Sequence, residues 1–285
     1  MQKKIDNWGV VGGLAFIHLG ALAAFVPQFF SWPAFFVMLG LIYLTNGVGI
    51  AFCYHRLLTH RSMKVPKAVE YFTALLGTLS LQGSPVDWVA THRIHHAYSD
   101  TGKDPHNSNL GFRWSHLQWL YLANQSLPSP ELQKQMAPEL VADPFYRFLN
   151  KNFVLLQLML AAVLFLAGGL PFVVWGMLVR LVFTYHLTWL INSAAHSTGY
   201  QTFRSNDRSR NCWWLGIFGW GEGWHNNHHA FPSSARHGLA WYEFDITWLT
   251  IQLLRACGIA RDVKVPSHEL QSRLRLKGPR DPVSV

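Results

Sequence analysis

Histidines are the residues best suited to chemistry in this chain of 285 residues, which contains 15 of them. His55 and His60 form an H-x-x-x-x-H pattern, and the pattern H-x-x-H-H occurs twice further along the chain. One more histidine follows Asn192 by four positions in the segment N-S-A-A-H. The candidate metal ligands are therefore His55, His60, His92, His95, His96, His196, His225, His228 and His229.

The spacing of these histidines predicts how they share helix faces. Residues i, i+3 and i+4 of a helix lie on one face, so the three histidines of each H-x-x-H-H pattern are expected to converge on one point. His55 and His60 are about 140° apart around an ideal helix. They converge only if the helix ends or distorts between them, and otherwise they serve two different metal ions.

Nine imidazoles are more than one metal ion takes, so two ions are expected. Imidazole suits zinc, copper, iron and nickel, whereas a structural zinc site is typically closed by four ligands that often include cysteine. An all-nitrogen site for two ions at a membrane surface suits oxygen chemistry by iron better. No catalytic side chain is predicted beyond the metal centre. Carboxylates that could orient the imidazoles lie nearby in the sequence: Asp87, Asp100, Asp104 and Glu222.

The elements that position these histidines are predicted to be membrane helices. Charged residues make up 14% of the chain, against about 25% in soluble domains. No charged residue occurs in the 49 positions between Asp6 and Arg56, and a span needs roughly 20 apolar residues. Two further uncharged stretches follow Lys151. The predicted spans are about 9–27, 33–53, 152–168 and 171–193, the last two turning at 168–171.

Basic residues avoid both predicted hairpin turns and concentrate in the N-terminus, in 56–151 and after 203, with Arg180 as the exception. This bias places both termini and the middle segment in the cytoplasm, and it accounts for a net charge of +9 without nucleic acid as a partner. We therefore predict one all-α integral-membrane domain over 1–285. Four transmembrane helices in two hairpins carry a helical cytoplasmic cap, 54–151 and 194–265, which holds the histidines, and a polar tail follows at 266–285.

The three histidine boxes resemble those of the membrane fatty acid desaturases, and the resemblance is closest to the delta-9 branch. It extends to Asp104-Pro-His-Asn107, to Gly111-Phe112 with Ser115-His116, to Thr188-Trp189 before Asn192-Ser-Ala-Ala-His196, and to Gly223-Trp224 before the last box. It covers about residues 33–265. The fold implied by the resemblance is a four-span bundle with a cytoplasmic cap and a di-iron site.

The resemblance also implies the activity and the roles of individual residues. The nine histidines would bind two iron ions, and Asn192 would hold a metal-bound water. Trp189, with Thr188 beside it, would shape a bent acyl tunnel, and Trp88 and Arg93 join the candidates for substrate contact. The implied reaction uses O2 to introduce a cis double bond, at the delta-9 position, into a saturated acyl chain.

The resemblance leaves the acyl carrier open between CoA and a membrane glycerolipid. In the animal acyl-CoA enzymes an arginine that helps to hold CoA precedes the second box, and Ala90 stands at that place here. This difference weakens the acyl-CoA assignment.

Electrons for the reaction must come from a separate protein. The chain has no H-P-G-G haem-binding sequence, and its three scattered cysteines provide no iron–sulfur ligand set. A ferredoxin or a cytochrome b5 is expected, and the basic cytoplasmic face would attract an acidic carrier. The boxes alone do not separate a desaturase from a related di-iron lipid hydroxylase or monooxygenase. A metal transporter is disfavoured because it would need ligands near the bilayer midplane.

Overall fold

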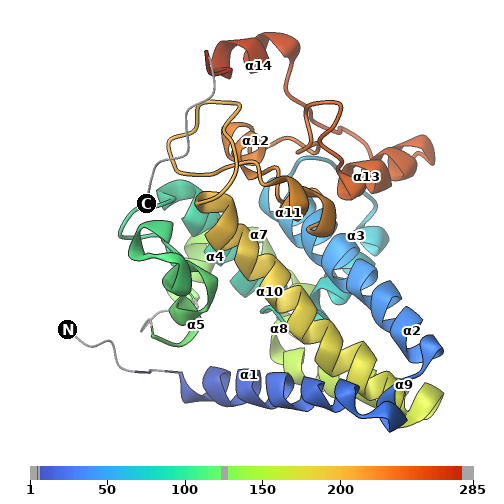
Figure 1. Ribbon diagram of the computed structural model, residues 1–285. Helices are drawn as coiled ribbons and strands as arrows, with labels where there is room; N and C mark the ends of the chain where they lie inside the picture. Colours follow the sequence, from blue (N-terminus) through green and yellow to red (C-terminus); the bar gives the residue numbers. More distant parts are fainter. Residues whose placement is uncertain (1–4, 6, 123–127, 278–285) are drawn as a thin grey trace.

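The computed structural model describes residues 5, 7–122 and 128–277 and is built from helices (Figure 1). Within these ranges no β-strand forms, and only isolated bridges such as Lys64–Arg261 occur. The predicted all-α class is therefore confirmed for the described part of the chain.

The first two apolar helices begin where the sequence provides caps. The side chain of Asn7 accepts a hydrogen bond from the backbone N–H of Val10 at the start of α1 (Trp8–Ala21), which continues as the 3₁₀ turn η1 (Leu22–Phe25). After a second 3₁₀ turn, η2 (Pro27–Phe29), Ser31 caps α2 (Trp32–Ile42). That helix continues without a break into the π-helical segment η3 (Tyr43–Thr59).

The second apolar pair is a continuous run of helical segments with one break. It consists of α9 (Phe153–Val173), η6 (Val174–Val179) and α10 (Arg180–Ser193), followed by the short η7 (Ala194–His196). Gly168 and Gly169 leave helical geometry inside α9, and Gly169 has a φ of 66°, a conformation that glycine adopts easily. The break lies at the turn predicted from Gly168-Gly169-Leu170-Pro171.

Among the residues that the structure describes, three helices are long and apolar enough to cross a membrane: Trp8–Phe25, Trp32–Thr59 and Phe153–His196. The third is 44 residues long and contains the break at Gly168 and Gly169. Arg180, the charged residue predicted inside a span, is fully buried in the bundle. Its guanidinium donates hydrogen bonds to the carbonyls of Gly176 and Leu79, so the buried charge has polar partners.

The cap is assembled from short helices that precede and follow the second apolar pair in the sequence. Its N-terminal part contains α3 (Lys67–Thr78), α4 (Pro85–Tyr98), η4 (Ser108–Leu110), η5 (Trp114–Gln118), α5 (Trp119–Leu122), α6 (Pro130–Met136), α7 (Pro138–Ala142) and α8 (Pro144–Lys151). Its C-terminal part contains α11 (Trp213–Phe218), α12 (His225–Ala230) and α13 (Ile246–Ala256). In Figure 1, α11 and α12 lie near the upper ends of α10 and α2, whereas α5 and α8 of the N-terminal part lie lower in the view.

One close backbone contact lies where the cap meets the bundle. The backbones of Gly49 in η3 and Gly77 in α3 approach so closely that a Cβ atom on Gly49 would lie 2.4 Å from the Gly77 nitrogen. The predicted polar tail begins with the exposed helix α14 (His268–Leu274), and residues 278–285 of that tail lie outside the described residues.

Candidate metal centre

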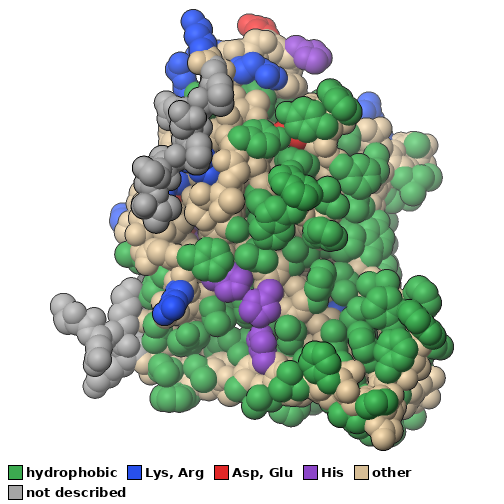
Figure 2. Space-filling view, in the orientation of Figure 1, with side chains coloured by type: hydrophobic (Ala, Val, Ile, Leu, Met, Phe, Trp, Pro, Cys, Tyr) green, Lys and Arg blue, Asp and Glu red, His purple; other side chains and the backbone are tan. Residues whose placement is uncertain are grey.

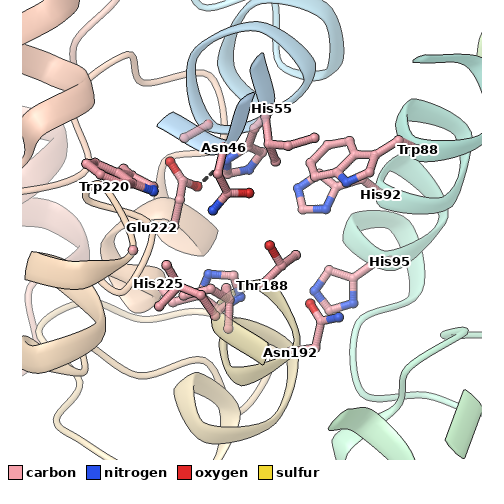
Figure 3. A pocket seen from close by; sticks show the side chains of 15 residues that line it. Asn46, His55, Trp88, His92, His95, Thr188, Asn192, Trp220, Glu222 and His225 are labelled. Carbon is pink, nitrogen blue, oxygen red and sulfur yellow. Dashed lines mark ion pairs between the residues drawn. The ribbon is translucent and has the colours of Figure 1, made fainter. Parts of the chain in front are cut away.

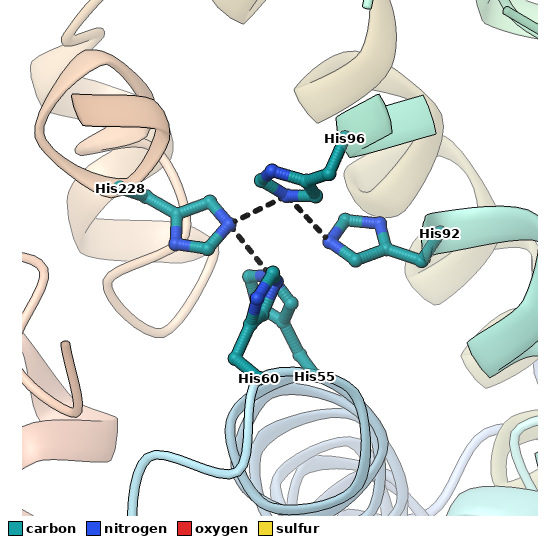
Figure 4. Close-up of side chains that lie close together, drawn as sticks. All are labelled: His55, His60, His92, His96 and His228. Atoms are coloured by element: carbon teal, nitrogen blue, oxygen red, sulfur yellow. Dashed lines mark hydrogen bonds between the residues drawn. The ribbon is translucent and has the colours of Figure 1, made fainter. Parts of the chain in front are cut away.

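The predicted histidine ligands lie in two adjacent groups. Within each group, ring nitrogens lie within 4.8 Å of one another. The first group has five members, drawn from η3 and the residue after it, from α4 and from α12. Figure 4 shows their rings turned toward a common centre: His55, His60, His92, His96 and His228. The second group has four members, from α4, η7 and α12: His95, His196, His225 and His229.

Each H-x-x-H-H pattern is divided between the two groups. In α4, His92 and His96 belong to the first group and His95 belongs to the second. The expectation that all three converge on one point is therefore wrong. Residues i and i+4 differ by about 40° around a helix, whereas i+3 and i+4 differ by about 100°, so neighbouring histidines diverge toward separate centres. The same division holds in α12, where His228 joins the first group.

The π-helical geometry of η3 explains why His55 and His60 lie in one group. The backbone N–H of His60 donates to the carbonyl of His55 at 3.1 Å, an i→i+5 bond that brings residues five apart into register. The sequence left open whether His55 and His60 converge or serve two different metal ions. In the structure the helix is distorted and both histidines belong to the first group.

The arrangement of the imidazole nitrogens suits a metal ion better than it suits hydrogen bonds between the rings. Nε2 atoms of buried rings meet in pairs, at 3.0 Å for His55 and His228 and at 3.0 Å for His196 and His225. The Nε2 atoms of His60, His95 and His229 are buried and have no hydrogen-bond partner within the described residues. Buried polar atoms normally have partners, and converging imidazole nitrogens without them are what a transition metal binds.

Carboxylates fix the outer nitrogens of four of these rings. Nδ1 of His95 donates to Asp104 at 3.0 Å, Nδ1 of His196 donates to Asp100 at 3.1 Å, and Nδ1 of His55 is paired with Glu222. Such partners hold the tautomer in which Nε2 carries the lone pair for a metal ion. Three of the four carboxylates suggested by the sequence are therefore in place.

The carboxylates beside the histidines differ from the predicted set in two respects. Asp87 instead bonds Ser84 and Gln133, so its proposed role beside the histidines is wrong. The fourth partner is Asp207, which accepts from Nδ1 of His229 at 2.5 Å. It lies 22 positions before its histidine, and no spacing rule in the sequence points to it.

Burial sets the charge of the centre. It lowers the pKa values of His60, His92, His96, His228 and His229 well below the ordinary value, and the neighbouring histidines lower them further. Burial alone would raise the pKa of Asp104, but His106 and His95 lower it to about 2. These five rings are therefore neutral and the carboxylate is ionised at neutral pH, which is the state that metal binding requires.

Sequence reasoning left out two more histidines of the centre, His237 and His106. The His237 ring is buried, its centroid lies 4.4 Å from that of His228, and its Nδ1 lies 3.6 Å from Glu222. The His106 ring lies 4.3 Å from that of His95 and beside Asp104. Neither belongs to a repeated spacing, so only the tertiary structure brings them to the centre.

A small cavity of about 50 Å³ borders both groups. His55 and His92 of the first group and His95 and His225 of the second line it, as Figure 3 shows. A cavity of about 550 Å³ shares Trp88, His92, Thr188 and Asn192 with it and extends past Trp189. The structure thus places four of the predicted residues along these two cavities, and their roles in a reaction stay predictions: Trp88, Thr188, Trp189 and Asn192.

Arg93 does not line either of these cavities. Its guanidinium donates to the carbonyls of Leu58, Thr59 and Met136 and pairs with Glu139. These bonds tie α4 to the end of η3 and to α6, so the suggested substrate contact has no support and the side chain has a structural role.

Comparison with known proteins gives a consistent result. Residues 10–254 match the family model described as fatty acid desaturase. The chain is 52% identical to an sn-1 stearoyl-lipid 9-desaturase of Anabaena variabilis over 266 residues, covering 92% of this chain and 96% of that protein. It is 44% identical to a chloroplastic palmitoyl-monogalactosyldiacylglycerol delta-7 desaturase of Arabidopsis thaliana, over 96% of this chain and 73% of the relative. It is 43% identical to an icosanoyl-CoA 5-desaturase of Limnanthes douglasii, over 97% of this chain and 78% of that protein.

Proposed function

Because the chain belongs to the fatty acid desaturase family and is an oxidoreductase, we propose that it introduces a cis double bond at the delta-9 position of a saturated acyl chain carried on a membrane glycerolipid. The observation that carries this proposal is the junction of two histidine groups with an apolar cavity. The delta-9 position and the lipid carrier rest on the names of the relatives from Anabaena variabilis and Synechocystis, both sn-1 stearoyl-lipid 9-desaturases.

Each histidine group would hold one iron ion. Five imidazoles are available to the first, and four imidazoles with a water held by Asn192 are available to the second. When bound, the two iron ions supply the O2-dependent oxidation of unactivated C–H bonds, which no protein acid or base can perform. The carboxylates Glu222, Asp104, Asp100 and Asp207 keep the imidazoles oriented.

The protein's own part in the reaction is positioning. The acyl chain lies in the cavity of about 550 Å³, and Thr188 and Trp88, which line both cavities, place its reacting carbons beside the histidines. Trp189 stacks on Tyr185 with ring centroids 5.2 Å apart, so its ring is a fixed wall of the cavity. A fixed wall limits how far a chain advances and therefore which carbons reach the centre.

Four membrane spans with the cap in the cytoplasm fit this function. The break at Gly168 and Gly169 allows Phe153–His196 to cross twice, and basic residues concentrate in the cap. Each reaction removes two hydrogens from the substrate and reduces O2 to two waters, which requires two further electrons and two protons. A ferredoxin or a cytochrome b5 would deliver the electrons at the basic cytoplasmic face.

The test is a lipid profile by mass spectrometry in a host that lacks its own desaturase. We expect a new monounsaturated acyl chain with the wild type and none with His228→Ala, which removes one member of the first group. The double-bond position and the lipid class of the product test the delta-9 and glycerolipid assignments separately. A hydroxylated chain would establish the monooxygenase alternative. An unchanged lipid profile, with iron-loaded protein and a working donor present, would refute the proposal.

A further inference from the structure

Large apolar side chains are exposed on the cap beside the last histidine pattern. They belong to α11, to the loop that precedes α13 and to α13 itself, and between 50% and 93% of each is exposed: Trp213, Phe218, Trp241, Tyr242, Phe244 and Leu253. We call this surface the aromatic face. The surface of a soluble monomer rarely gathers so many large apolar side chains, so the aromatic face marks a contact with lipid or with another molecule.

The aromatic face exposes no charge. Residues 213–220 and 239–253, all of which the structure describes, contain two charged residues, Glu243 and Asp245, and both are buried. Glu243 accepts a hydrogen bond from the amide of Asn227 at 2.8 Å, and Asp245 pairs with Arg56 at 3.0 Å. Both carboxylates are therefore turned into the cap. A charged electron carrier finds no complementary charge here, which disfavours this surface as its docking site.

The aromatic face continues the exposed surface of the second apolar helix. The hydroxyls of Thr250 in α13 and Tyr43 in η3 are hydrogen-bonded at 2.9 Å, and the rings of Tyr43 and Trp220 lie 5.4 Å apart. Phe36 and Leu39 extend the exposed apolar surface along α2. In Figure 1, α11 and α13 lie beside the upper end of α2, and Figure 2 shows hydrophobic side chains from that region down to the apolar helices.

The residue types of the aromatic face suit the boundary between water and lipid. Trp213, Trp241 and Tyr242 carry the amphipathic rings that are enriched where the head groups of a bilayer meet its acyl chains. In α13, Leu253 is exposed whereas Ile251 is fully buried, so one side of this helix packs on the cap and the other is free to contact lipid.

The aromatic face is joined directly to the helix that carries the last histidine pattern. Trp224, the residue before His225, donates from its ring nitrogen to the carbonyl of Phe244 at 2.8 Å. Its ring also packs against Gly216 of α11, where a Cβ atom would collide with it. The position of the aromatic face therefore determines the position of α12.

We propose that the aromatic face is embedded in the cytoplasmic leaflet, with its tryptophan and tyrosine rings between the head groups and the acyl chains. The inference rests on the membrane-spanning arrangement in the proposed function, because it is the lipid-facing surface of α2 that the aromatic face prolongs. The cap is then partly inserted in the membrane, which holds α12 and its histidines at a fixed depth relative to the lipid that supplies the substrate.

The test measures contact with lipid at one position of the face. Cys257, the exposed cysteine among the three, is replaced by serine, and Trp241→Cys is labelled with a fluorescent maleimide. The labelled protein is placed, one copy per disc, in phosphatidylcholine nanodiscs whose acyl chains are brominated near the head group. We expect several-fold stronger quenching by bromine at position 241 than in the control Arg273→Cys. Arg273 is exposed on α14, which lies at the end of the molecule farthest from α1 in Figure 1.

The alternative occupants give different results. Equally weak quenching at positions 241 and 273 would overturn the proposal. A label at 241 that is shielded only with two copies per disc would make the face an interface between copies of this chain, and one shielded only after addition of a [2Fe–2S] ferredoxin would make it a carrier site. Either result also overturns the proposal. If Trp241→Cys does not insert, Phe244→Cys is measured in the same way and must be quenched.

Failure of the proposed function gives a separate signal. Release of the wild type from membranes by alkaline carbonate would refute the membrane-spanning arrangement itself. Quenching at position 241 in a protein whose wild type forms no double bond would refute the proposed reaction and leave the membrane contact of the aromatic face in place.

Discussion

Nδ1 of His229 donates a hydrogen bond of 2.5 Å to Oδ2 of Asp207, a residue 22 positions earlier in the chain. The backbone N–H and the hydroxyl of Ser209 hold the other oxygen, Oδ1, of this carboxylate at 3.0 Å and 2.5 Å. The carboxylate is therefore fixed from one side and fixes the imidazole on the other. As a result, Nε2 of His229 is left without a hydrogen and directed at the second histidine group.

Replacement of Asp207 should weaken metal binding at the second group. We expect Asp207→Ala to lower iron affinity about 10- to 100-fold, the usual effect of removing a carboxylate that orients a ligand histidine. Iron retained against a graded chelator series measures this. Asp262→Ala is the matched control, because that aspartate pairs with Lys64 on the surface. Equal iron retention in the Asp207→Ala variant and the wild type would show that the hydrogen bond does not orient His229.

Arg93 should prove structural rather than substrate-binding. Its guanidinium is bonded to three backbone carbonyls and to Glu139, so Arg93→Ala removes the side-chain donor of those carbonyls, whereas Glu139 keeps its ion pair with Arg61. We expect a loss of about 2–4 kcal/mol in the free energy of unfolding, since each buried group left unpaired costs about 1–3 kcal/mol. The KM for the acyl substrate should not change. Arg113→Ala, at an exposed arginine, is the control, and a raised KM with unchanged stability would restore the substrate-contact assignment.

The stability of the iron-free protein should depend on pH through its buried histidines. Burial lowers the pKa values of His60, His92, His96 and His228 well below 6.5, so the unfolded chain binds protons more readily than the folded one. Their contribution is full above about pH 6.5, the unfolded pKa, and is lost progressively as the pH falls below it. Thermal unfolding in detergent should give a constant Tm from pH 8 to 7 and a falling Tm from pH 6.5 to 5. A Tm that rises over the acidic range would contradict this sign.

The sequence indicated which nine histidines lie together, because helix periodicity and the histidine boxes are local features. It could not predict that each H-x-x-H-H pattern divides between two groups, since this depends on the approach of η3, α4 and α12 from different directions. His55 and His60 were ambiguous for a related reason. Whether a five-residue spacing converges depends on π-helical geometry, which has no reliable sequence signal.

The apolar spans followed from composition, and the break at Gly168 and Gly169 followed from the local turn residues. Asp207, His237 and His106 were not predicted as members of the centre, because only long-range packing brings them there. The bonds of Arg93 to backbone carbonyls were not predicted, because an arginine in a ligand-bearing helix has the same sequence signature whether it contacts a substrate or a backbone carbonyl.

Arg56 joins the metal centre to the rest of the cap, and its replacement should affect both. The side chain is fully buried, and its guanidinium pairs with Glu222 and Asp245 at 3.0 Å each and donates to the carbonyl of Ala235 at 2.8 Å. Removing one partner of a buried ion pair costs about 3–5 kcal/mol, because the remaining charges stay desolvated. We therefore expect Arg56→Met to lower the free energy of unfolding by about that amount.

Arg56→Met should also lower iron occupancy of the first group, because Glu222 loses the partner that holds it beside His55. Denaturant unfolding and the iron-to-protein ratio measure the two effects, with Arg255→Met on the exposed side of α13 as the control. Adding Asp245→Asn to Arg56→Met should restore part of the stability and none of the iron, because it removes the stranded charge at Asp245 but leaves Glu222 unheld. Recovery of iron together with stability would instead mean that the network acts on folding alone and does not position the imidazole of His55.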